Sequence, residues 1–262
     1  MRIVRVEDAS GRVVYGRHDG QRVLRIEGDP LDGGPRVTDE PVQVARLLAP
    51  VAPPSIFAIG MNYREHARET GREVPSEPVI FMKAVTSLNH PGSPIVLPAV
   101  SSKVDYEAEL AVVIGRKARN VSQERALDHV LGYTCANDVS ERYWQRRLGQ
   151  WIRGKSFDTF CPLGPWIETQ VADPNALRVC CRLNGLTMQD STTADMIFSV
   201  AELISFLSQD LTLQPGTVIL TGTPQGVGEA RNPPVFLRPG DEVTVAVEGI
   251  GELSNPILAA GA

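Results

Sequence analysis

Residues 104–115 read VDYEAELAVVIG, with acidic side chains at Asp105, Glu107 and Glu109 followed by the apolar run LAVVI. An extended conformation would place the three acids on one face, about 6.7 Å apart along the strand. Like charges this close repel each other unless a cation lies between them, and Mg²⁺, Mn²⁺ and Ca²⁺ prefer oxygen ligands. A solvated face of an edge strand is the alternative, but the apolar run is typical of a buried strand. The segment therefore favours a buried strand with a metal site at its mouth.

The composition is that of a globular protein and excludes several classes. The chain has 262 residues, of which 42% are hydrophobic and 22% charged, with a net charge of −5. These values exclude collagen-like, coiled-coil and disordered chains, and the negative charge argues against nucleic-acid binding. No run of about 18 apolar residues occurs, so we expect no membrane span. The N-terminal sequence resembles neither a signal nor a transit peptide, and we expect a cytoplasmic protein.

The four cysteines form no CxxC pair, which argues against a zinc site. Cys180 and Cys181 lie in a run typical of a strand, where neighbouring side chains point to opposite faces. We therefore expect buried free thiols, which suit a reducing compartment.

The chain divides near residues 49–54, a segment rich in proline and alanine. Residues 1–28 alternate apolar and polar side chains around two turn signals and predict a short antiparallel meander, followed by a short helix over residues 41–48. From residue 55 onward, strand-like runs outnumber helical ones and do not alternate with them, which predicts an α+β fold with a mixed, β-rich core. The predicted helices cover residues 122–131, with Ser122 as a capping candidate, 140–149 and 196–209.

Two further segments carry side chains suited to catalysis. His66 and Glu69 are three residues apart, so on a helix the carboxylate meets the imidazole and orients it as a general base. A chance surface pair is the alternative. Asp138 follows the apolar run LGYTCAN and either caps the next helix or joins the acids of residues 105–109 as a metal ligand.

Two loops complete the set of candidate sites. Lys155, one of four lysines, lies in a loop rich in proline, glycine and apolar residues. Residues 220–228 (LTGTPQGVG) follow a strand-like run and offer backbone amides and the Thr223 hydroxyl to an anion. A structural turn is the alternative for both loops.

Taken together, these segments resemble the fumarylacetoacetate hydrolase family. The matching pieces include GMNYREHARE (60–69), DYEAELAVVIG (105–115), GYTCANDVSER (132–142) and RGKSFDTFCPLGP (153–165), in the family's order over residues 55–258. The resemblance implies a catalytic domain over residues 55–262 with a β-sandwich or β-roll core, preceded by the small β-rich domain of bacterial members over residues 1–50. It also implies a homodimer and one Mg²⁺ or Mn²⁺ per subunit.

The resemblance assigns roles to individual residues. The implied metal ligands are Glu107, Glu109 and Asp138; Asp105 is expected to support them without binding the ion. The implied catalytic residues are His66, Glu69 and Lys155, and the implied substrate contacts are Arg142, Gln145 and Thr223. Glu141 and Tyr143 depart from the family's usual NDxSARD pattern, which affects the shape of the pocket.

The expected activity is metal-dependent hydrolysis of a carbon–carbon bond in a small β-diketo acid, such as an acylpyruvate or fumarylpyruvate. The intact His66–Glu69 pair favours hydrolysis. Oxaloacetate decarboxylation, isomerisation of 2-hydroxyhepta-2,4-diene-1,7-dioate and ureidoglycolate cleavage are alternatives on the same metal site. A binding protein for oxo acids without turnover is a further alternative.

Overall fold

The computed structural model describes residues 1–32, 36–147 and 149–261. Within these residues most strands belong to two mixed sheets, so the predicted β-rich α+β fold is confirmed. The strands of the larger sheet are β1 (Arg2–Asp8), β2 (Val13–His18), β3 (Val23–Glu27), β4 (Arg36–Pro41), β5 (Val44–Leu48), β6 (Ile56–Gly60), β7 (Val79–Lys83), β8 (Leu88–Asn89), β11 (Ala108–Ile114), β12 (Val130–Asn137), β14 (Cys161–Glu168) and β17 (Val218–Leu220). Their order is β4-β3-β2-β1-β14-β12-β11-β17-β6-β7, with β5 paired to β1 and β8 to β14.

The second sheet packs against the middle of the first. Its strands, in spatial order, are β16 (Leu186–Thr192), β15 (Arg178–Leu183), β18 (Glu242–Val247), β19 (Gly251–Ala259) and β9 (Ile95–Leu97). A separate short pair joins β10 (Val104–Asp105) to β13 (Ser140–Glu141).

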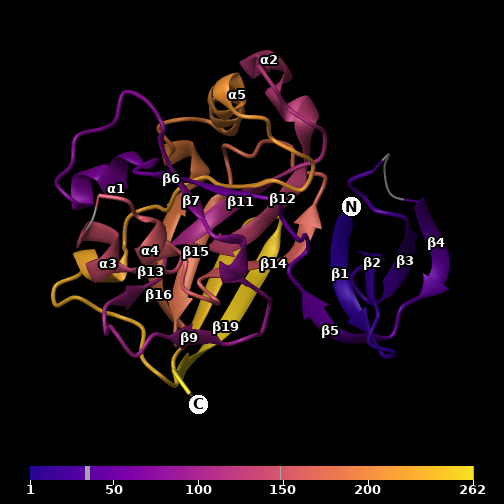
Figure 1. The fold of residues 1–262 in the computed structure, drawn as a ribbon, viewed down its shortest axis with the longest axis horizontal. Coiled ribbons are helices and arrows are strands. Elements are labelled where there is room, and N and C mark those ends of the chain that lie inside the picture. Colours follow the sequence, from indigo (N-terminus) through magenta and orange to yellow (C-terminus); the bar gives the residue numbers. More distant parts are fainter. Residues whose placement is uncertain (33–35, 148, 262) are drawn as a thin grey trace.

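The helices are short apart from one. They are α1 (Arg64–Glu69), α2 (Gln123–Ala126), α3 (Arg142–Arg147), α4 (Ile152–Lys155) and α5 (Val200–Asp210), with single 3₁₀ turns η1 (Val85–Ser87), η2 (Leu127–His129), η3 (Thr193–Asp195) and η4 (Gly228–Ala230). Figure 1 shows α2 and α5 together above the sheets, and α1, α3 and α4 at the end of the molecule opposite β1–β5. None of the described helices is long and apolar enough to cross a membrane.

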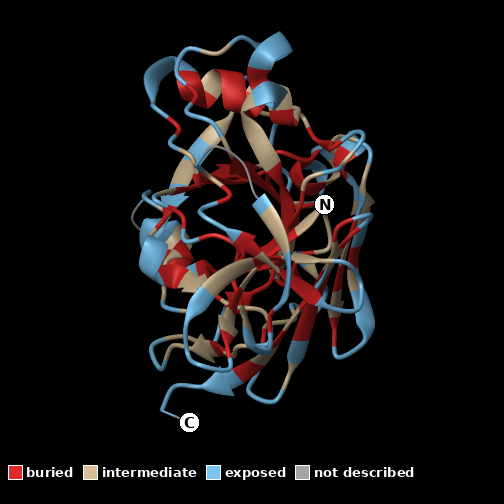
Figure 2. Ribbon diagram, turned by 90° about the vertical axis from the view of Figure 1, so that its right-hand side faces the viewer, coloured by how far each residue is buried: buried red, intermediate tan, exposed pale blue. Residues whose placement is uncertain are grey.

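Strand β11 is buried on both faces, which is why its sequence after Glu109 is apolar without alternation. Leu110, Val112 and Ile114 face the cluster between the two sheets, together with side chains of β15 and β18. Ala111 and Val113 face a second cluster, to which strands of the N-terminal segment contribute. Figure 2 shows buried residues concentrated in the central strands and exposed residues mainly in the loops.

Strands β11 and β12 run antiparallel, and their register sets the geometry beyond their ends. Ala108 lies opposite Asn137, and Glu109 lies opposite Ala136. One step further, the Asp138 amide donates a hydrogen bond of 2.9 Å to the Glu107 carbonyl. The predicted continuous strand over residues 104–115 is therefore interrupted between β10 and β11, and Glu107 lies at the interruption, opposite Asp138.

The N-terminal segment forms the predicted meander, with β1, β2 and β3 antiparallel. The predicted helix over residues 41–48 is wrong, because Val44–Leu48 pairs with β1 as strand β5. Strand β1 also pairs with β14 at Arg2–Glu168 and Ile3–Ile167, so this segment continues the larger sheet. That residues 1–50 form a separate domain stays a prediction.

Of the remaining predictions, one helix is shorter than expected, while a second helix and the free thiols are as expected. The helix expected over residues 122–131 ends early, because β12 begins at Val130, and the Ser122 side chain makes no capping hydrogen bond. Helix α3 lies within the range expected for residues 140–149, of which Leu148 is outside the described residues. The expected free thiols are confirmed: Cys135, Cys161 and Cys181 are buried, and Cys180 is partly buried.

Helix α5 begins with a capping box rather than at the predicted residue 196. The Ser199 hydroxyl accepts a hydrogen bond from the Glu202 amide, and the Glu202 carboxylate accepts one from the Ser199 amide. Behind this cap, Leu203, Ile204 and Leu207 are buried in the main core.

We predict that Ser199→Ala lowers the free energy of unfolding by about 1 kcal/mol, because the Glu202 amide loses the hydroxyl that accepts its hydrogen bond. For a chain of this size, the melting temperature should fall by roughly 2–4 °C in a thermal denaturation measured by circular dichroism. Ser122→Ala is the matched control, since Ser122 precedes α2 without a capping bond, and it should change stability by less than about 0.5 kcal/mol. An equal effect of the two substitutions would contradict the role of the cap.

Candidate active site

A cavity of about 70 Å³ lies where α1, β11, α3, α4 and the loop after β17 meet. The charged and polar side chains that line it are His66, Thr70, Arg72, Glu107, Glu109, Arg142, Gln145, Arg146, Lys155, Thr223 and Glu229. Phe81 and Trp151 contribute apolar wall. Gly60 also lines the cavity, and a Cβ there would lie 2.5 Å from the Trp151 ring, so this glycine lets the ring pack against β6.

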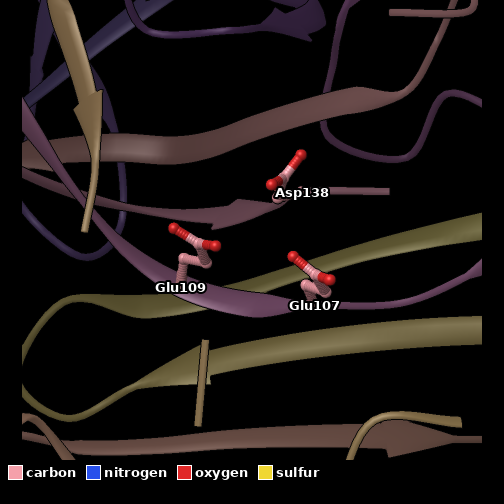
Figure 3. Close-up of side chains that lie close together, drawn as sticks. All are labelled: Glu107, Glu109 and Asp138. Atoms are coloured by element: carbon pink, nitrogen blue, oxygen red, sulfur yellow. The ribbon is translucent and has the colours of Figure 1, made fainter. Parts of the chain in front are cut away.

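Three buried carboxylates converge at the inner end of the cavity. Glu107 is 5% exposed, Glu109 1% and Asp138 0%, and one oxygen from each lies within 4.8 Å of the others. Figure 3 shows Glu107, just before β11, and Glu109, within β11, both extending toward Asp138. The structure thus brings together the three residues that the sequence singled out as metal ligands.

Two buried lysines hold Asp138. The Lys83 ammonium donates to Asp138 Oδ1 at 2.6 Å, and the Lys155 ammonium donates to Oδ2 at 2.5 Å. Lys155 also donates to Glu107 Oε2 at 2.7 Å, and its Nζ lies 4.9 Å from the centre of the Phe81 ring. Burial lowers the pKa of Lys155, but the two carboxylates outweigh it and raise that pKa overall, so the side chain stays charged.

Arg142 joins Asp105 to the triad. Its guanidinium donates two hydrogen bonds to Asp105, at 2.7 and 2.9 Å, and one of 2.5 Å to Glu107 Oε1. Asp105 also accepts from the amides of Gly228 and Glu229, at 2.8 and 3.0 Å. As expected, Asp105 lies outside the triad and supports it by fixing Arg142 and the loop that carries Glu229.

Glu109 differs from its neighbours because no cationic group of the described residues lies within 4.0 Å of its carboxylate. It accepts a hydrogen bond of 2.7 Å from the Gly222 amide. Burial, followed by the charges of Asp138 and Glu107, raises its pKa well above the usual range. Burial also raises the pKa of Glu107, but Lys155 and Arg142 reverse the effect and lower it overall. A cluster with one uncompensated carboxylate and several oxygen donors fits a hard divalent cation.

The predicted His66–Glu69 pair forms on helix α1. His66 Nδ1 lies 3.1 Å from Glu69 Oε2, and the other oxygen of Glu69 accepts from the Gly226 amide at 2.7 Å. The carboxylate is therefore held by the loop that follows β17 and in turn orients the imidazole. His66 is 8% exposed and lines the cavity.

The predicted substrate contacts lie in the same cavity with partners of their own. Gln145 Oε1 accepts from Arg142 at 3.1 Å, which turns its amide group toward the guanidinium. The Thr223 hydroxyl donates to the Ala108 carbonyl at 3.0 Å and accepts from Gln189 Nε2 at 2.8 Å. To donate to a substrate carboxylate, Thr223 would have to give up its bond to Ala108.

Seven of the nine predicted site residues line the cavity, and the other two, Glu69 and Asp138, bind residues that do. Their catalytic, ligating and binding roles stay predictions. Sequence reasoning missed Lys83, although the scarcity of lysines that drew attention to Lys155 applies to it equally. It also missed Arg72, Arg146 and Glu229, for which no sequence signal was available.

Family models match nearly the whole chain. The model described as fumarylacetoacetate (FAA) hydrolase C-terminal matches residues 55–258, and a model described as Rv2993c-like, N-terminal matches residues 1–50. The chain belongs to the fumarylacetoacetate hydrolase family. The resemblance seen in the sequence is confirmed, and the buried acidic triad agrees with a family that typically binds a divalent metal.

Relatives within this family are named as enzymes. The mitochondrial oxaloacetate tautomerase fahd2 of Xenopus laevis is 50% identical over 244 residues, which cover 91% of this chain and 76% of the relative. The human mitochondrial oxaloacetate tautomerase FAHD2A is 50% identical over 217 residues, covering 81% of this chain and 69% of the relative. The structure of 2-hydroxyhepta-2,4-diene-1,7-dioate isomerase from Mycobacterium marinum superposes with a TM-score of 0.89 at 40% identity, covering all of both chains. The cytoplasmic location of the present chain stays a prediction.

We predict that Mg²⁺ or Mn²⁺ stabilises the protein, because a cation between the carboxylates removes their repulsion. At a concentration 100 times the dissociation constant, the free energy of unfolding should rise by about 2.7 kcal/mol. This corresponds to an increase of roughly 5–10 °C in melting temperature. Differential scanning calorimetry with each metal, and with EDTA, measures the effect.

Glu109→Gln should abolish this metal-dependent increase, since the introduced amide keeps an acceptor for the Gly222 N–H but lacks the charge. Glu65→Gln is the matched control, because Glu65 is partly exposed on helix α1 and its carboxylate pairs with Arg68 at 2.8 Å, outside the triad. A wild-type protein whose melting temperature does not respond to either metal would refute the metal site.

Proposed function

We propose that the chain catalyses proton transfer between carbon and oxygen in a small 2-oxo acid, with oxaloacetate as the first substrate to test. The observation that carries the proposal is that one small cavity combines the acidic triad, a charged lysine and the His66–Glu69 pair. The relatives named as oxaloacetate tautomerases, and the structure named as an isomerase, support it. Both names describe proton movement without loss of atoms from the substrate.

Glu107, Glu109 and Asp138 would hold one Mg²⁺ or Mn²⁺. When bound, the ion would supply Lewis acidity, which polarises the keto group and makes the adjacent C–H bond more acidic. Mg²⁺ and Mn²⁺ both prefer oxygen ligands, so these three carboxylates would accept either ion.

His66 is the proton carrier in this proposal. Because Nδ1 is engaged with Glu69, Nε2 is the nitrogen that faces proton exchange. Nε2 takes a proton from the carbon next to the keto group and transfers it to the keto oxygen, so the keto acid becomes its enol. The reverse path restores the keto acid, and no atom is gained or lost.

Lys155 stabilises the negative charge that develops on oxygen during the transfer. Two of its three N–H bonds are directed at Glu107 and Asp138, which leaves the third for a substrate oxygen. Because the ammonium is already fixed in a buried position, little reorganisation is needed as the charge develops. Lys83 acts through Asp138, by holding that carboxylate from the opposite side.

Hydrolysis of an acylpyruvate is the second candidate, and the intact His66–Glu69 pair favours it. Here His66 takes a proton from water, and the hydroxide attacks the carbonyl of the acyl group. The bond between that carbonyl carbon and the adjacent carbon breaks, giving a carboxylic acid and the enolate of pyruvate. That enolate then takes up the proton held by His66.

Product analysis separates these reactions. The protein is incubated with oxaloacetate, acetylpyruvate or fumarylpyruvate, in Mg²⁺, Mn²⁺ or EDTA. Faster loss of the ultraviolet absorbance of oxaloacetate enol, without release of pyruvate, supports the tautomerase. Pyruvate with CO₂ identifies a decarboxylase, and pyruvate with a matching carboxylic acid identifies a hydrolase.

The expected homodimer is tested by sedimentation velocity.

We predict that His66→Ala lowers kcat by about 10²–10⁴-fold, because general acid–base catalysis contributes a factor of this size. Glu69→Gln should lower kcat less, since the amide still reaches the imidazole but no longer stabilises its charge. Glu65→Gln, three residues from Arg68 on the same helix, should leave kcat unchanged. Unchanged turnover in both His66→Ala and Glu69→Gln would rule out the assigned proton carrier.

A further inference from the structure

The cationic side chains that line the cavity are nearly all neutralised by carboxylates of the chain itself. Lys155 pairs with Glu107 and Asp138, and Arg142 pairs with Asp105 and Glu107.

Arg146 is paired in the same way, with Glu229 at 2.5 Å, and the imidazole of His66 lies against Glu69. The remaining cation that lines the cavity is Arg72.

Arg72 has no carboxylate within 4.0 Å among residues 1–32, 36–147 and 149–261. The residue is exposed, whereas Lys155 is 2% exposed, so Arg72 lies at the outer end of the cavity and Lys155 at the inner end. The cavity therefore has two ionisable groups without an oppositely charged partner: the carboxyl group of Glu109 inside and the guanidinium of Arg72 at the mouth.

The backbone fixes Arg72 relative to the proton carrier. Its amide donates to the Ala67 carbonyl at 2.9 Å, and the Thr70 amide donates to the His66 carbonyl at 3.1 Å. Between them Gly71 adopts a φ of +65°, which reverses the chain after helix α1. A ligand that binds Arg72 thus contacts the segment that carries His66 and Glu69.

We propose that Arg72 binds a second carboxylate of the substrate, at the end opposite the 2-oxo acid group, and so selects dicarboxylates. The inference rests on the proposed function, because it assumes that the 2-oxo acid group lies at the inner end with Lys155. A guanidinium presents parallel N–H donors that match the two oxygens of a carboxylate, and the charge strengthens both hydrogen bonds. Arg146 is less suited to this role, because Glu229 already occupies its guanidinium.

This assignment distinguishes among the candidate substrates. Oxaloacetate and fumarylpyruvate carry a distal carboxylate, whereas acetylpyruvate ends in a neutral acetyl group. A substrate with a neutral end leaves Arg72 unmatched, and the site should discriminate against it.

The first test measures turnover by wild-type protein and by Arg72→Gln, with oxaloacetate and with its 4-methyl ester. Arg72→Gln should lower kcat/KM for oxaloacetate by about 10- to 100-fold, the range expected for a lost charged hydrogen-bonded pair, and leave the ester unaffected. Arg72→Lys should recover part of the loss. Arg68→Gln is the matched control, because Arg68 is exposed on the same segment but does not line the cavity.

The second test measures binding alone, by calorimetry on the Mg²⁺-loaded protein. Wild type should bind 2-oxoglutarate more tightly than 2-oxobutyrate, which lacks the distal carboxylate, and Arg72→Gln should remove the difference. Equal binding of the two acids by wild type, or an equal loss of both in Arg72→Gln, would overturn the inference. Selective binding without turnover of any oxo acid would instead contradict the proposed function and leave the role of Arg72 standing.

Discussion

The antiparallel pairing of β11 with β12 is the constraint on which the site depends. With Ala108 opposite Asn137, the residues just beyond the ladder, Glu107 and Asp138, are brought face to face. A slip of one residue would turn every side chain of β11 to the opposite face, and would bury an acid in the apolar core between the sheets. Because β11 is apolar on both faces, the core enforces the register that the site needs.

Charge balance then determines how the acids are tolerated. Four buried carboxylates (Asp105, Glu107, Glu109 and Asp138) face three buried cations (Lys83, Arg142 and Lys155). An unpaired charge inside a protein is costly. Of these four carboxylates, only that of Glu109 has no cationic group within 4.0 Å among the described residues. The ion pairs also link segments far apart in the sequence, since Asp105 fixes both α3 and the loop after β17. The same loop holds Glu69 through the Gly226 amide, so the triad and the His66–Glu69 pair share one scaffold.

Much of this arrangement could be predicted from the sequence, because it depends on local patterns. The alternation in residues 1–28 gives the meander, and the acids at alternate positions mark the end of β11. The helix predicted over residues 41–48 is wrong because the apolar spacing in a run of eight residues is compatible with both a helix and a strand. Pairing with β1 decides for the strand. The positions of Lys83 and Arg72 in the site could not be predicted, because they depend on how distant segments come together. The local sequence around a lysine at the end of a strand, or an arginine after a helix, does not indicate which side chains will surround it.

Side chains at the inner end of the cavity have more hydrogen-bond and ion-pair partners than those at its mouth, and this difference affects which positions tolerate substitution. At the inner end, each of Glu107, Asp138 and Arg142 is held by at least two neighbours, so replacing one disturbs several others. At the mouth, an exposed side chain such as Arg72 can be substituted without breaking a contact between buried residues. Substitutions at the mouth would therefore change the contacts offered to a substrate, while the buried groups keep theirs. Relatives that share this fold are named both as tautomerases and as isomerases.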